Sequence, residues 1–182
     1  MAQGNEFVSS GSIAADGSFT DSFNQTYTDE VYPLGSLRYQ SADEVAASTH
    51  TDGTNLGLKG DRTWIFVKAT TALTIYDCAI VKAADTATAS FEVAPSDAAG
   101  DNALDVVGVA QTAIGLNEFG WIVCAGECVV NGAAGITKGQ FIDTHTGGQV
   151  DDSTAAGTLI GKALSDTGTP VAGTIRARIR LP

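Results

Sequence analysis

Positive charge is scarce in this 182-residue sequence. Ten Lys and Arg residues stand against 21 Asp and Glu residues, for a formal net charge of −11 at pH 7. Nucleic acids and anionic membranes attract basic surfaces, so we expect neither as a partner. No apolar run reaches the roughly 18 residues of a membrane-spanning helix. Residues 1–12 also lack the basic region and apolar run of a signal peptide, so we expect a protein that works where it is made or leaves the cell without the secretory route.

Catalytic motifs are also missing. The sequence contains no G-x-S-x-G, H-E-x-x-H, P-loop or G-x-G-x-x-G motif. His50 and His145 lie among Thr and Gly residues, which is typical of surface loops. Asp97, Asp101 and Asp105 repeat every four residues, a spacing that differs from the calcium-binding loop. We therefore expect neither enzyme activity nor a cofactor or metal, with a weak surface calcium site as the alternative for the three aspartates.

Cysteine is rare, and its three residues form an odd set. Cys78, Cys124 and Cys128 are therefore interpreted as buried thiols rather than as a disulfide framework. Two alternatives stay open. Cys124 and Cys128 could form a local disulfide if Gly126 reverses the chain, and zinc could bind if both histidines joined the cysteines.

Bulky apolar residues are few as well, since Leu, Ile, Val and Phe make up 42 of the 182 residues. Such a chain can form only a thin core for its length. We therefore expect the subunit to complete its burial against copies of itself or against a partner.

What the sequence does contain, from residue 61 onward, is a series of short β-branched or aromatic runs separated by Gly, Asp and Asn. This pattern predicts an all-β fold, a β-sandwich or barrel of short, mostly antiparallel strands. The predicted strands lie within residues 62–69, 73–83, 89–94, 104–114, 119–130, 139–144, 158–165 and 174–181. We divide the chain into an N-terminal arm and loop region, 1–60, and a β-rich domain, 61–182.

The N-terminal region is polar and rich in glycine, with widely spaced apolar residues. Phe19, Phe23, Tyr27 and Val31 recur every four residues, which suggests a helical stripe although the residues between them are poor helix formers. We expect an extended arm held by a neighbouring molecule, with the fold-back of the arm over its own domain as the alternative. The candidate partner contacts in the arm are Phe7, Phe19, Phe23 and Tyr27.

Three of the ten basic residues lie in the last predicted strand. Alternation places Ile175, Ala177, Ile179 and Leu181 on one face and Arg176, Arg178 and Arg180 on the other. The arginines are either a solvated face of an edge strand or a docking stripe for an acidic surface. We treat them as candidate partner contacts.

Trp64 and Trp121 are the two tryptophans, and each lies in a predicted strand. Their positions favour burial in the core or at a subunit contact. Stacking on sugars is the alternative.

Several segments resemble the decoration, or cement, proteins of tailed bacteriophage heads. The segments are YPLGSLRYQ (32–40), GDRTWIFVKATTAL (60–73), NEFGWIVCAGECVV (117–130), ITKGQFIDTHTGGQVDD (136–152) and IGKALS (160–165). Each one is ordinary strand and turn sequence, so their shared order along the chain carries the resemblance.

The resemblance implies a β-rich homo-oligomer, typically a homotrimer, that is made in the host cytoplasm and binds the outer surface of the virion head. There it would clamp neighbouring copies of the major capsid protein. No catalytic residue is implied. The alternative is a virion adhesin or carbohydrate-binding β-domain.

Overall fold

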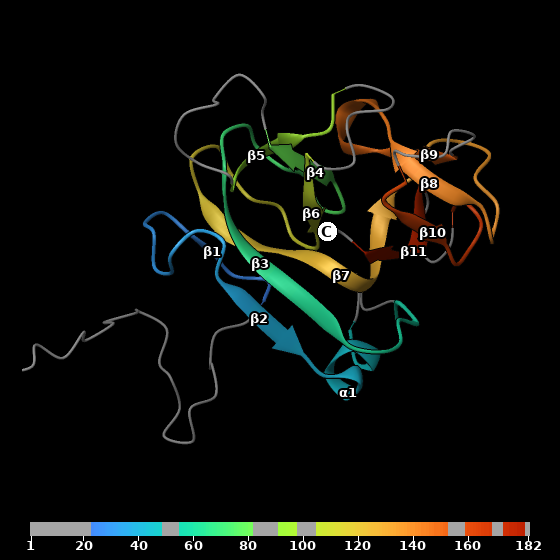
Figure 1. Cartoon of the computed structure of the whole chain (residues 1–182), viewed down its shortest axis with the longest axis horizontal. Coiled ribbons are helices and arrows are strands. Elements are labelled where there is room, and N and C mark those ends of the chain that lie inside the picture. The colour runs from blue at the N-terminus through green and yellow to red at the C-terminus, as the bar shows by residue number, and fades with distance from the viewer. Residues whose placement is uncertain are drawn as a thin grey trace, which may run out of the picture.

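The computed structural model of the chain describes residues 23–48, 55–81, 91–97, 105–152, 159–168 and 173–180. Regular structure in these residues is nearly all β-strand, which confirms the all-β prediction (Figure 1). The strands are β1 (Thr26–Tyr27), β2 (Leu37–Gln40), β3 (Arg62–Ala69), β4 (Cys78–Val81), β5 (Glu92–Pro95), β6 (Val106–Ala110), β7 (Phe119–Asn131), β8 (Phe141–Thr144), β9 (Val150–Asp152), β10 (Gly161–Ala163) and β11 (Thr174–Arg180). The helices among the described residues are α1 (Ala42–Ala46) and the 3-10 turn η1 (Thr146–Gly148).

Strand pairing closes part of the sheet into a ring. β3 pairs with β5, β5 with β4, β4 with β6, β6 with β7, and β7 again with β3. Within this ring only the β3–β5 pair is parallel, as expected for short, mostly antiparallel strands. The second half of β7 continues into the order β11, β10, β8 and β9, and β2 pairs with β3 outside the ring.

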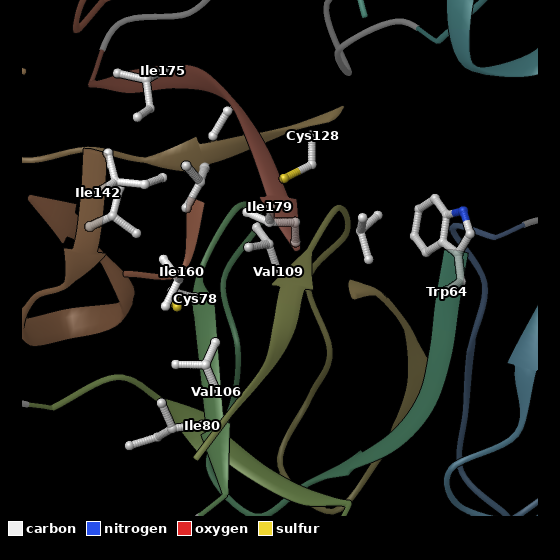
Figure 2. Close-up of a cluster of buried hydrophobic side chains, with 14 of the residues drawn as sticks. Trp64, Cys78, Ile80, Val106, Val109, Cys128, Ile142, Ile160, Ile175 and Ile179 are labelled. Atoms are coloured by element: carbon white, nitrogen blue, oxygen red, sulfur yellow. The ribbon is translucent and has the colours of Figure 1, made fainter. Parts of the chain in front are cut away.

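Two apolar clusters pack against the strands of this ring. The smaller takes side chains from every ring strand, as the interior of a small barrel does. It contains Val67, Ala69, Leu73, Ala79, Val93, Ala110, Ile114 and Ile122. The larger cluster connects ring strands to β8, β10 and β11, and Figure 2 shows it extending from Trp64 to Ile142 and Ile175. The limited set of bulky residues is thus divided between these two clusters and a smaller third one that includes Leu58 and Val129.

The described part of the region 1–60 contributes strands to the sheet, because β1 pairs with β7 and β2 with β3. The expected helical stripe is wrong over its described part. Phe23 lies in a turn, Tyr27 lies in β1, and the larger cluster packs against Val31. Thr, Ser and Asn between these residues favour turns and extended backbone, and the apolar side chains gain more by packing on the sheet.

β7 runs without reversal through Cys124, Gly126 and Cys128. Gly126 adopts a φ of +110°, yet the residues on both sides of it stay paired with β11. The tight turn that a disulfide between Cys124 and Cys128 would require does not form. The disulfide alternative is therefore wrong, and all three cysteines are free thiols. Cys78 and Cys128 are buried and Cys124 is half-buried. Burial raises the pKa of the Cys128 thiol to about 12.

Candidate functional site

The predicted alternation of the last strand is confirmed in β11. Ile175, Ala177 and Ile179 are buried in the larger cluster, so Arg176, Arg178 and Arg180 lie on the opposite face. β11 is an interior strand rather than an edge strand, because β7 and β10 pair with its two sides. The arginines therefore cannot serve to protect an edge.

Arg178 is bound within the subunit. Its Nη2 donates to Glu127 Oε1 on the neighbouring strand β7 at 2.7 Å. The Glu127 side chain is only 8% exposed, whereas that of Arg178 is 64% exposed. Glu127 Oε2 also accepts from the backbone N–H of Lys59 at 2.9 Å. One carboxylate thus connects β7, β11 and the chain that leads into β3.

Arg176 holds the same stretch of chain, because its Nη1 donates to the carbonyl oxygen of Gly57 at 2.7 Å. We call residues 55–59 the covering segment. Its Leu56 and Leu58 pack with Val129 of β7 in a third apolar cluster. Arg176 binds the covering segment directly, and Arg178 binds it through Glu127, which accepts from Lys59. These contacts hold the segment over Val129 and keep that side chain from solvent.

Arg180 differs from the other two arginines. It is exposed, and its guanidinium makes no hydrogen bond or ion pair with a described residue, although its backbone N–H donates to the carbonyl oxygen of Ile160 at 3.3 Å. Within the part of the chain that the structure describes, the guanidinium of Arg180 and the exposed part of Arg178 thus remain as candidate contacts for an acidic partner. We keep both as candidate partner contacts.

The aromatic residues of the arm fall into two groups. Phe7 and Phe19 lie outside the described residues. Phe23 stacks on Trp64, with ring centroids 4.7 Å apart, and Tyr27 is buried in the larger cluster. Tyr27 is only 7% exposed within its own subunit, and its ring lies edge-on to that of Phe66, with the centroids 6.0 Å apart.

Both tryptophans are buried, each about 1% exposed. Trp64 Nε1 donates to Gln40 Oε1 at 3.0 Å, and the guanidinium of Arg38 lies 5.1 Å from the ring centroid of Trp121. The prediction of core positions is confirmed. The sugar-stacking alternative is wrong for these two residues, because neither indole face is open to a ligand.

Arg62 is a buried cation that the sequence did not single out. Burial lowers the pKa of its guanidinium, although Glu127 nearby opposes this effect. Its Nε and Nη2 have no hydrogen-bond partner among the described residues. Its position beside Trp64, at 5.8 Å from the ring centroid, supplies a cation–π contact.

A set of large apolar side chains is exposed on the surface of the described structure. They are Leu37, Tyr39, Leu116, Phe141 and Leu159. Leu37 and Tyr39 lie together on β2, and the alternation of LRYQ is the sequence signal that could have found them. The carboxylate of Asp61 beside Tyr39 raises the pKa of its phenol.

His145 and most of the described acidic residues lie outside the core, whereas Asp77, Glu127 and Asp143 are buried. His145 opens the turn η1, and its Nε2 lies 3.9 Å from Asp151 Oδ2, in keeping with a surface loop. His50 and Asp101 lie outside the described residues. Within the described ranges, no three His, Cys, Asp or Glu side chains gather into a group that could hold a metal ion. None of the described helices has the length and apolarity to span a membrane.

Comparison with known proteins finds similar chains among solved structures. No family model matches the chain, and no curated protein matches it. The N-terminal base of the head fibre protein gp8.5 of bacteriophage phi29 is similar over 64% of this chain and 92% of that chain, at 14% identity and a TM-score of 0.46. A TM-score of this size is too low to establish a shared fold, so the likeness assigns neither fold nor function here.

Proposed function

We propose that this chain is a structural protein of a bacteriophage head that binds the outer surface of the shell. The observation that carries the proposal is the arrangement of the segments resembling head decoration proteins. The segments containing β2, β3 and β7 lie side by side, because β3 pairs with both of the others. The segment 136–152 supplies β8 and β9, and β8 pairs with β10. The segments that carry the resemblance therefore all contribute strands to one connected sheet.

The subunit acts as a homo-oligomer, a homotrimer in this proposal, that clamps neighbouring copies of the major capsid protein. Exposed apolar side chains and the outward part of the arginine stripe supply contacts of modest area. A repetitive shell presents the same contact many times, so each arm of an oligomer raises the effective affinity of the next. Small individual contacts therefore suffice for stable attachment.

Heads prepared with and without this subunit test the proposal. Both populations are heated and subjected to osmotic shock, and genome release is measured by nuclease sensitivity. We expect heads that lack the subunit to release DNA at lower temperature and after milder shock, and addition of purified protein to restore resistance. Equal resistance of the two populations would contradict a clamping role.

A further inference from the structure

β2 is an edge strand whose outward backbone can be identified residue by residue. The N–H of Phe66 in β3 donates to the carbonyl of Ser36 at 2.9 Å. In an antiparallel pair, alternate residues face the partner strand. Ser36 and every second residue after it therefore face β3, whereas Leu37 and Tyr39 turn their N–H and C=O groups away from it.

These outward groups are open along the described structure. No described strand pairs with the outer side of β2. Figure 1 shows β2 at the border of the sheet, next to β3. The next outward donor, the N–H of Ser41, is bonded to Glu44 Oε2 at 3.0 Å where α1 begins. The available edge is thus confined to Leu37 and Tyr39 and is closed at its far end by the helix cap.

The side chains on this edge are large, apolar and exposed. Leu37 is 63% exposed and Tyr39 is 65% exposed, both on the face opposite the buried Arg38. The Asp61 carboxylate lies near the phenol of Tyr39 and raises its pKa. Proteins usually protect open edges with an outward lysine or a proline. β2 has neither, because its one basic side chain points inward.

The charge around the edge selects its occupant. Asp43, Glu44 and Asp61 are exposed at the end of β2, and Asp29 and Glu30 are exposed before its start. Glu30 reaches that end, since its Oε1 accepts from the N–H of Leu34 at 3.3 Å. Lys59 is the exposed cation in the chain leading into β3. Acidic residues therefore predominate at both ends of the open edge.

A second copy of this chain is disfavoured by the same charges. Pairing of β2 with β2 of another copy would bring the two sets of carboxylates together. The chain's own basic strand, β11, is already paired on both sides and cannot be added to another sheet. A strand of a different protein with basic flanks fits both the backbone and the charge.

We infer that the β2 edge accepts an extended segment of the coat subunit, with alternating apolar side chains and Lys or Arg at its ends. The inference rests on the proposed function for the identity of the partner. The N–H and C=O groups of Leu37 and Tyr39 bond to the added strand, and its apolar side chains pack beside theirs. The contact area is small, so the interaction is weak for one copy and strong only on a repetitive shell.

Two substitutions at Tyr39 test its outward N–H and its phenol hydroxyl. Tyr39→Pro removes the outward N–H, and an edge strand tolerates proline where the N–H faces away from its neighbour. Tyr39→Phe keeps the N–H and the aromatic ring and removes only the phenol hydroxyl. In co-sedimentation with heads that lack the subunit, we expect Tyr39→Pro to bind about 10-fold more weakly or worse. Tyr39→Phe should stay within about twofold of the unmodified protein.

Hydrogen exchange of the unmodified protein provides a readout that needs no variant. The amides of Leu37 and Tyr39 should exchange quickly in free protein and become protected on heads. If the protein binds heads but these amides stay unprotected, or if folded Tyr39→Pro binds normally, the edge inference is overturned while the proposed function stands.

If the protein does not bind heads, the proposed function is contradicted. A peptide measurement then tests the edge inference on its own. The probe is a short peptide of alternating valine and threonine with lysine at both ends, titrated against isotope-labelled protein. We expect amide shifts at Leu37 and Tyr39, which are reduced by Tyr39→Pro and by replacing the peptide's lysines with glutamates. Absence of shifts, or equal shifts with both peptides, would overturn the edge inference.

Discussion

Arg178 and Glu127 form an ion pair of 2.7 Å between neighbouring strands, and the carboxylate that takes part is almost fully enclosed. The second oxygen of Glu127 is occupied by the N–H of Lys59. A residue that the sequence offered as a partner contact is therefore also part of the subunit's own architecture. The proposed partner surface therefore overlaps contacts that stabilise the fold, and its variants must be chosen accordingly.

Glu127 should contribute more to stability than Arg178. Glu127→Ala removes the acceptor for Lys59 and the partner of Arg178, and we expect a loss of about 2–3 kcal/mol in the free energy of unfolding. Arg178→Gln should cost about 1 kcal/mol or less, because most of that side chain is in solvent. Urea unfolding of the two variants checks the order, and an equal effect would show that the Lys59 contact contributes little.

Arg180 separates partner binding from stability. We expect Arg180→Gln to leave the free energy of unfolding within about 0.5 kcal/mol. It should weaken attachment to heads and lower the salt dependence of attachment. Arg176→Gln is the matched control, since it should release the covering segment and cost about 1–2 kcal/mol of stability. Unchanged attachment of Arg180→Gln at every salt concentration would assign the stripe to the solvated surface.

Gly126 tolerates no side chain. Its φ is +110°, and a Cβ there would lie 2.4 Å from the carbonyl oxygen of Asp61. We expect Gly126→Ala to destabilise the subunit by about 2 kcal/mol or more. Gly135 has a similar φ of +97° and open space around it, so Gly135→Ala should cost only about 1 kcal/mol. Thermal unfolding of both variants measures the difference, and equal losses would contradict the close approach at Gly126.

The Cys128 thiol should make stability fall in alkaline solution. Its pKa is about 12 in the folded protein because the thiol is buried, and about 8.5 in an unfolded chain. The folded state therefore keeps a proton that the unfolded state loses. The contribution is complete below about pH 8.5 and decreases as pH rises toward 12, by up to about 1.4 kcal/mol per pH unit.

Cys128→Ala provides the comparison for this pH dependence. The variant should be less stable at pH 7, since it leaves a small cavity, but its stability should decline less steeply between pH 9 and 11. Urea unfolding in reducing buffer at several pH values measures both slopes. Parallel slopes would show that Cys128 does not titrate as a buried thiol.

Much of the fold could be predicted from local sequence patterns. β11 follows from strict alternation, and β3 and β7 follow from runs with apolar residues on both faces. β1 and β2 were missed because they are short and lie in a polar region, and only pairing with β7 and β3 makes them strands. The closure of the ring rests on the parallel β3–β5 pair, which joins residues far apart in the chain.

The candidate site was predictable only in part for the same reason. The face of β11 that carries the arginines follows from alternation, but the partners of Arg176 and Arg178 come from the covering segment and from β7. The burial of Tyr27 depends on its contact with Phe66, which no local pattern encodes. Which side of β2 is open likewise depends on its pairing with β3 alone.

The central claim is attachment to the outside of a phage head, and cryo-electron microscopy tests it most directly. Heads lacking the subunit are imaged before and after incubation with purified protein at saturating concentration. We predict added density at symmetry-related positions on the outer surface, into which the sheet fits with β2 facing the shell. Reconstructions that are identical before and after incubation would contradict the account.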